Sequence, residues 1–260
     1  DTWLRPDNAK LVIVGDTTEA EIKPLLEKAF SEWQAPTTAV PTKQLDTPAP
    51  RSESRVFLID QPGTPQSLII AGQLAPSGTT AKADLIDVTN TILGGSFTSR
   101  LNMNLREDKG WSYGARSIWL DSEGPGLLIA LAPVQIDKTT ESIEEILKEY
   151  NQYEGDKPAT EDELKKVIAN KTAKLPGAYE TKSALMSALT ETLNKGKTIE
   201  YLEAYPSRVS AITLDQVQSE AKDLLRPDAL TWVIVGDLDV IEDKVREMNL
   251  GEVTILKETK

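Results

Sequence analysis

Residues 94–119 read GGSFTSRLNMNLREDKGWSYGARSIW, and the periodicity of this stretch changes once, at Gly110. Before Gly110 apolar residues recur at every fourth position, namely Phe97, Leu101 and Leu105, which is the spacing of one helix face. After Gly110 the pattern alternates with the period of a β-strand. We therefore expect a helix that ends at a left-handed glycine, then a tight corner and a strand.

Two polar side chains flank this expected corner. Arg106 falls in the last helical turn, and Tyr113 falls near the start of the strand. A guanidinium and a phenol held close together are donors suited to carbonyl or carboxylate oxygens. Each residue also has a purely structural interpretation, because an arginine at a helix C-terminus offsets the helix dipole and a tyrosine can cover the edge of a core. The spacing alone leaves both interpretations open.

Composition excludes several classes of function. The chain has 260 residues and a net charge of −12, which disfavours nucleic acid and anionic membranes as partners. It contains no cysteine, which excludes disulfides and thiolate catalysis. It contains no histidine either, which excludes a histidine general base, a Ser–His–Asp triad and a histidine-ligated zinc site.

The same composition leaves the cellular compartment open. No apolar run approaches the length of a membrane span, and a chain without cysteine suits both the cytoplasm and the bacterial periplasm. Because the sequence begins with aspartate and shows no signal-peptide pattern, we expect an N-terminus that has been processed or truncated.

An internal repeat organises the chain. Residues 5–16 read RPDNAKLVIVGD and residues 226–237 read RPDALTWVIVGD, so eight of twelve positions are identical. Each copy predicts a buried strand, a Gly-Asp turn and then an amphipathic helix. Capping boxes are expected at three helix starts in the chain, formed by Thr18 with Glu21, Thr160 with Glu163 and Thr213 with Gln216. The second copy closes a long stretch of predicted structure, whereas the first copy opens the chain. We therefore expect the chain to begin with the tail of one homologous unit and to continue with a second, complete unit.

The expected domain organisation follows from this repeat. Residues 1–34 are the last strand and helix of an upstream domain, and the proline-rich residues 35–52 are an extended linker. Residues 53–260 form a complete domain, in which strands joined by short turns are followed by runs of helices. This order favours an α+β fold with a mostly antiparallel sheet that is covered on one face by helices.

Other chemistry-bearing patterns are weak. Gly94-Gly95-Ser96 lacks the spaced glycines and the lysine of a phosphate-binding loop. The carboxylate-rich stretches at 141–149 and 161–163 are typical of solvated helix faces. No serine or threonine has an evident general base nearby in the sequence.

The run LGGSFTSRLNMNLREDKGWSYGARS at 93–117, together with the duplicated PD…VIVGD strand, resembles the pitrilysin/insulinase-like zinc metallopeptidases. Mitochondrial processing peptidase belongs to the same family. The resemblance extends over nearly the whole chain, and its most specific part is Leu-Gly-Gly, Ser-Arg-Leu and Leu-Arg-Glu-x-x-Gly-x-x-Tyr. It implies two homologous halves, each a sheet with helices on one side, that enclose a peptide as a clamshell.

In that family the catalytic half carries the zinc motif His-x-x-Glu-His, whose glutamate is the general base. Because this chain has no histidine, it resembles the other, non-catalytic half. In that half an arginine and a tyrosine bind the substrate backbone, and Arg106 and Tyr113 match their spacing. The resemblance thus implies no cofactor in this chain, zinc in a missing catalytic half, and two partners: an upstream catalytic domain or subunit, and a peptide substrate.

The expected function is therefore the non-catalytic, substrate-binding half of a two-domain zinc metallopeptidase, inactive by itself. The alternative is a catalytically dead structural subunit of the same fold, as the resemblance to core subunits of respiratory cytochrome reductases implies. A third interpretation is an acidic binding module without a peptide site. The sequence leaves open which peptide is bound and whether the catalytic half lies on the same polypeptide.

Overall fold

The computed structural model describes residues 2–257, which form two compact units. The larger unit contains residues 47–172 and 205–257, and the smaller contains residues 2–46 and 173–204. The predicted division into 1–34, 35–52 and 53–260 rests on the internal repeat. The two compact units reflect contacts within the chain and do not test that division.

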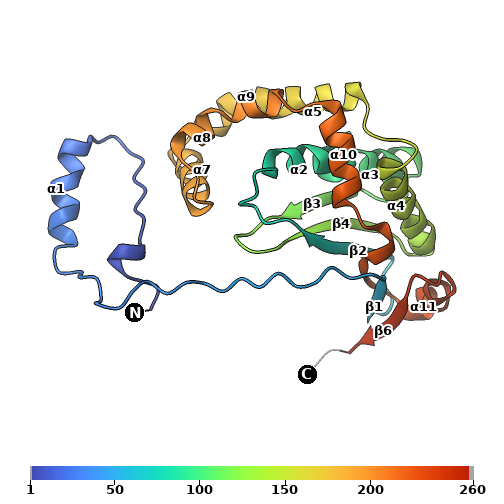
Figure 1. Ribbon diagram of the computed structural model, residues 1–260. Coiled ribbons are helices and arrows are strands. Elements are labelled where there is room, and N and C mark those ends of the chain that lie inside the picture. Colours follow the sequence, from blue (N-terminus) through green and yellow to red (C-terminus); the bar gives the residue numbers. More distant parts are fainter. Residues whose placement is uncertain (1, 258–260) are drawn as a thin grey trace. The chain divides into compact units, whose positions relative to one another are not determined.

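A six-stranded mixed sheet forms the centre of the larger unit, in the order β3-β4-β2-β5-β1-β6 (Figure 1). Three of its pairings, β3 with β4, β4 with β2 and β2 with β5, are antiparallel, whereas β1 pairs in parallel with β5 and β6. The predicted, mostly antiparallel sheet is confirmed. The strands are β1 (Arg55–Asp60), β2 (Gln66–Ala75), β3 (Arg116–Leu120), β4 (Gly126–Gln135), β5 (Thr231–Gly236) and β6 (Glu252–Leu256).

Helices cover one face of this sheet. Figure 1 shows helices over the strands, among them α2 (Ala83–Asn90), α3 (Arg100–Asn102), α4 (Thr139–Glu154) and α10 (Leu214–Leu224). The next helix, α11 (Leu238–Glu247), contacts β1 and α4. Along β2 and β4 every second residue is buried, which is the pattern of strands with one face against helices. The largest fully buried side chains are Trp232, Tyr150 and Tyr153, so the core lies between the sheet and these helices.

The two copies of the internal repeat fold differently. The second copy forms β5 and α11 as predicted, and β5 lies inside the sheet with Trp232 and Ile234 fully buried. In the first copy no strand forms, and Leu11 is 60% exposed. The predicted strand is absent because a strand needs a neighbour for its backbone hydrogen bonds, and the described residues supply none there.

The helix of the first copy does form, as α1 (Glu19–Ala29). It begins with the predicted capping box, in which Thr18 and Glu21 exchange side-chain and backbone hydrogen bonds. Its apolar residues Leu25 and Phe30 are nevertheless exposed. The first copy therefore forms the helix of the repeat, but it lacks both the strand and the burial that the second copy shows.

The remaining helices lie between α4 and α10 in the sequence. They are α5 (Glu161–Ala173), α6 (Leu175–Ala178), α7 (Lys182–Asn194), α8 (Ile199–Glu203) and α9 (Tyr205–Ser210). Threonine side chains cap α7 and α8: Thr181 accepts from the backbone N–H of Ala184, and Thr198 from that of Tyr201. Within residues 2–257, none of the helices has the length and apolar character needed to cross a membrane.

Candidate functional site

The segment before Gly110 is helical but is not the regular α-helix that its spacing predicts. It consists of the π-helix η2 (Thr91–Gly95), the single turn of α3 and a second π-helix, η3 (Met103–Asp108). Leu101 and Leu105 are buried as expected, but Phe97, which shares their spacing, is 61% exposed. Phe97 precedes the first turn of α3, so the helical period that predicts its burial does not yet apply there.

The corner itself forms at Gly110, whose φ of +66° is the left-handed conformation that the sequence predicts. Three backbone hydrogen bonds close it. The N–H groups of Lys109, Gly110 and Trp111 donate to the carbonyls of Asn104, Arg106 and Leu105, at 3.0, 3.2 and 3.0 Å. The backbone on both sides of the corner is thus held in one arrangement.

The strand after the corner begins later than predicted. Its alternation suggests a start at Trp111, whereas β3 begins at Arg116. The hydroxyl of Ser112 accepts from the N–H of Gly114 at 3.0 Å and donates to the carbonyl of Pro133 at 2.6 Å. This side chain builds a local turn, and the turn interrupts the alternation on which the prediction rests.

Side chains from the helical segment hold the outer edge of β3. Asn90 accepts a hydrogen bond from the Ser117 hydroxyl at 2.5 Å and donates to the Ser117 carbonyl at 3.3 Å. Asn102 accepts from the N–H of Ala115 at 3.1 Å. At Gly94 an added Cβ atom would lie 2.2 Å from the Ser117 backbone nitrogen. The glycine therefore permits a backbone approach that places helix and strand in contact.

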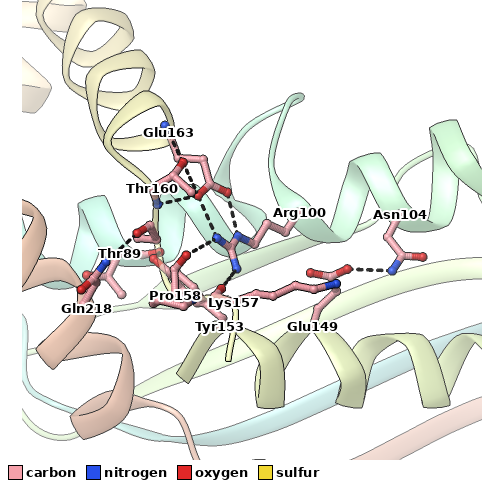
Figure 2. A network of polar contacts seen from close by, with 11 residues as sticks. Thr89, Arg100, Asn104, Glu149, Tyr153, Lys157, Pro158, Thr160, Glu163 and Gln218 are labelled. Carbon is pink, nitrogen blue, oxygen red and sulfur yellow. Dashed lines mark hydrogen bonds and ion pairs between the residues drawn. The ribbon is translucent and has the colours of Figure 1, made fainter. Parts of the chain in front are cut away.

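Arg100, which the sequence reasoning did not single out, is the centre of a polar network (Figure 2). Its Nε and Nη2 atoms donate to the two carboxylate oxygens of Glu163 at 2.7 and 2.8 Å. Nη1 donates to the carbonyl of Lys157 at 2.5 Å, and Nη2 also donates to that of Pro158 at 2.9 Å. The guanidinium carbon lies 4.6 Å from the centre of the Tyr153 ring. These contacts join α3 to Tyr153 on α4, to the connection that follows α4, and to Glu163 in the first turn of α5.

Glu163 and Tyr153 extend this network. The Glu163 carboxylate also accepts from the N–H of Thr160 at 2.8 Å, as in the capping box predicted for α5. Partial burial acts to raise the pKa of Glu163, but the bonds from Arg100 and Thr160 outweigh it and lower the pKa below its usual range. The Tyr153 hydroxyl donates to the carbonyl of Thr89 at 3.0 Å. Arg100 is thus a structural residue, although it lies in the Ser-Arg-Leu part of the motif.

A second charged cluster joins η3 to α4. The side-chain amide of Asn104 donates to Glu145 at 2.8 Å and to Glu149 at 2.7 Å. Lys109 and Lys148 pair with Glu145 at 3.0 and 2.9 Å. Burial acts to raise the pKa of Glu145, but the hydrogen bonds from Asn104, Lys148 and Lys109 lower it to about 2. This cluster fixes η3 against α4.

Arg106 lies on η3 and makes few contacts with the fold. Its guanidinium carbon lies 4.6 Å from the centre of the Phe97 ring, and its Nε lies 3.4 Å from a carboxylate oxygen of Glu107. Within residues 2–257 its terminal amino groups have no hydrogen-bond acceptor. The side chain therefore bonds none of the terminal carbonyls of its own helix, although its charge in the last turn still offsets the helix dipole.

Tyr113 lies in the loop between Gly110 and β3 and is 88% exposed. It does not cover the core, and the described part of the chain offers it neither a hydrogen bond nor a ring contact. The half-buried Arg106 and the exposed Tyr113 are thus two solvent-accessible donors on opposite sides of one corner, but no direct contact joins their side chains. That Arg106 and Tyr113 act together in binding a substrate therefore stays a prediction.

The donor set of this chain does not fit a zinc ion. The sequence has no histidine and no cysteine, and no three carboxylates among residues 2–257 come together as metal ligands. No step of metal chemistry can therefore be assigned to its own side chains.

Comparison with known families identifies the chain. A family model described as the peptidase M16 inactive domain matches residues 1–171. The chain belongs to this family. The matched part of this M16 inactive domain includes the whole of 94–119, with its corner, Arg106 and Tyr113.

Individual relatives agree with this assignment. The chain is 27% identical to the uncharacterized zinc protease YmxG of Bacillus subtilis (strain 168), over 87% of this chain and 53% of YmxG. A solved peptidase M16 inactive domain from Pseudomonas fluorescens matches with a TM-score of 0.74 and 18% identity, over 86% of this chain and 52% of that one. A protease from Helicobacter pylori matches with a TM-score of 0.73 and 18% identity, over 86% and 53%. The chain therefore spans about half the length of these relatives, and the two structures support the fold.

Proposed function

We propose that this M16 inactive domain is the substrate-binding half of a two-half zinc metallopeptidase, and that Arg106 and Tyr113 bind the backbone of a peptide. One observation carries the proposal. In a segment whose buried polar side chains are engaged inside the fold, Arg106 and Tyr113 reach solvent with donors that the described residues leave unused. Exposed arginine and tyrosine on a rigid support are typical of binding surfaces.

The chemistry of the two side chains fits a peptide backbone. The terminal amino groups of a guanidinium and the hydroxyl of a phenol are donors, and the peptide carbonyl is the acceptor that every residue of a substrate presents. The backbone bonds at Gly110 support both donors, so little ordering is needed when a peptide binds. A fixed cationic donor also stabilises negative charge that develops on a carbonyl oxygen during hydrolysis.

The catalytic half belongs elsewhere in this proposal. This chain spans about half of YmxG, a protein named as a zinc protease, and its own donors do not fit zinc. We place the zinc ion in an upstream homologous half, to which residues 1–34 would contribute the last strand and helix. Zinc held there would supply an activated water as the nucleophile for peptide hydrolysis. The role of the present chain is to bind and orient that peptide.

Peptide binding by the full-length protein tests the proposal. The probe is a fluorescein-labelled mixture of short random-sequence peptides, followed by fluorescence anisotropy in the presence of a zinc chelator. Arg106→Ala should weaken binding by roughly 10-fold to 100-fold, the loss expected for a hydrogen bond to a charged donor. Tyr113→Phe, which removes only the hydroxyl, should weaken it by about 2-fold to 10-fold.

Arg246→Ala is the matched control. Arg246 is also a partly exposed arginine paired with a glutamate, but it lies on α11, next to the far end of the sheet from β3. Its removal should leave peptide affinity unchanged. Full binding by Arg106→Ala, or no peptide binding by the wild-type protein, would contradict the proposal. The second result would favour the structural subunit of the same fold.

A further inference from the structure

Phe97 is exposed although its spacing predicts a core residue. Phe97 is 61% exposed, while Leu101 and Leu105 are almost completely buried. Its backbone position is defined, because the side-chain amide of Asn102 donates to the Phe97 carbonyl at 2.6 Å. Since this position does not contribute to the core, the exposed ring calls for another role.

The ring supports the guanidinium of Arg106. The guanidinium carbon lies 4.6 Å from the ring centre, which is within the range of a cation–π contact. The other contact of this guanidinium is the 3.4 Å approach of Glu107 to Nε. The ring and the carboxylate together restrict the side chain while leaving the two terminal amino groups available.

Other arginines that stack on rings are bound more firmly. Arg55 over Phe57, Arg100 over Tyr153 and Arg208 over Tyr205 each also donate a side-chain hydrogen bond from Nε. Their acceptors are Thr231, Glu163 and Asp84. Among residues 2–257 the guanidinium of Arg106 finds no such acceptor, so it is supported by the Phe97 ring and by the 3.4 Å pairing of Nε with Glu107.

We infer that Phe97 is a positioning residue that pre-orients Arg106 for an incoming peptide. This inference rests on the proposed function of Arg106. An unrestrained arginine side chain loses considerable rotamer entropy when it binds, and a ring that already restricts it reduces that loss. The ring acts through the guanidinium and does not need to touch the peptide.

Peptide affinity of the full-length protein, measured with the same probe and chelator, tests whether the Phe97 ring contributes to binding. Phe97→Leu keeps apolar bulk but removes the aromatic face, and it should weaken binding about 2-fold to 5-fold. Phe97→Tyr keeps the face and should retain the wild-type affinity. Because Phe97 is exposed, neither change should move the thermal unfolding midpoint. Phe57→Leu, at the Arg55–Phe57 pair on β1, is the matched control and should bind as the wild type does.

Two further measurements separate positioning from direct contact. In the Arg106→Ala background, Phe97→Leu should cause no additional loss of affinity, because the ring acts through Arg106. In NMR spectra the ring-current shift of the Arg106 Nε–H should vanish in Phe97→Leu and persist in Phe97→Tyr. Additive losses in the double variant, or an unchanged Nε–H shift in Phe97→Leu, would overturn the inference.

The shift is read without peptide, so its result does not depend on the proposed function. If Arg106→Ala binds peptide as the wild type does, the proposed function fails even where the shift shows the ring restraining the guanidinium. If Arg106→Ala loses binding and Phe97→Leu does not, the proposed function stands and the positioning role of Phe97 is overturned.

Discussion

A methyl group at Gly94 would lie 2.2 Å from the backbone nitrogen of Ser117, which neither a rotamer change nor a side-chain shift can relieve. We expect Gly94→Ala to lower the free energy of unfolding by about 2–4 kcal/mol, because it forces η2 away from β3. Urea unfolding measures the change. Gly72→Ala is the control in the same unit, since its methyl group would meet only ordinary contacts at 3.9 Å and beyond. An equal, small effect of both changes would show that η2 can move away from β3 at little cost.

The ionisation of Glu145 contributes to acid stability. Its folded pKa of about 2 lies below the ordinary 4.5, so its stabilising contribution is complete above about pH 5 and is lost as the pH falls towards 2. Asn104→Ala removes one of the donors that lower this pKa and should raise it. We expect the variant to lose about 1–2 kcal/mol at neutral pH and to show a shallower fall in stability between about pH 5 and pH 2.

Urea unfolding across that pH range measures both effects. Glu161→Gln is the control, because Glu161 lies on the surface in a 3.4 Å pair with Lys165. It should follow the wild-type pH profile. If Asn104→Ala also followed the wild-type pH profile of stability, Lys109 and Lys148 alone would account for the lowered pKa of Glu145.

At the scale of elements, Arg100 connects α3 to the start of α5. Arg100→Lys removes the two-oxygen contact with Glu163 and the donors to the two carbonyls, because an ammonium group cannot reproduce the planar fork. We expect a loss of about 2–3 kcal/mol and faster amide exchange in the connection between α4 and α5. Hydrogen exchange followed by mass spectrometry locates the opening.

Lys165→Ala, which removes an exposed pair on α5 itself, should change stability by no more than about 0.5 kcal/mol. If Arg100→Lys were equally mild, the network would be dispensable, and α5 would be held by its apolar contacts alone.

The ends of helices could be predicted where they depend on residues close together in the sequence. The capping boxes at Thr18 and Thr213 and the left-handed Gly110 are confirmed, since each depends on a few residues near one another in the sequence. The π-helices η2 and η3 were not predicted, because their widened turns depend on contacts with β3 and α4. The late start of β3 was missed for a related reason: the Ser112 hydroxyl bonds a carbonyl of another strand.

At the scale of the whole molecule, residues 10–14 (Lys-Leu-Val-Ile-Val) are a mostly apolar run without a strand partner among the described residues. We propose that this run completes a sheet in an upstream homologous half. In the 260-residue chain its amides should exchange rapidly, and in the full-length protein they should be protected, because backbone hydrogen bonds within a sheet slow exchange. Residues 231–235 of β5, the second copy of the repeat, are the internal control and should be protected in both. Rapid exchange at 10–14 in the full-length protein would contradict the proposed domain division.

The amino-acid sequence by itself determined the α+β class, the absence of a histidine zinc site and the family. These features depend on periodicity, on which residue types are present, and on a long motif, all of which can be seen in a linear chain. The sequence also singled out Arg106 and Tyr113, but by resemblance, since their spacing was equally compatible with structural roles.

Only the tertiary structure decided how the motif is used. It assigned Arg100 to an internal network and left Phe97 on the surface beneath Arg106, because burial depends on which elements pack together and not on the spacing within one helix. It also separated the two copies of the repeat: the same VIVGD run is a central strand in one copy and an unpaired extended segment in the other. The physical reason is that a strand exists through hydrogen bonds to its neighbours, which its own sequence does not contain.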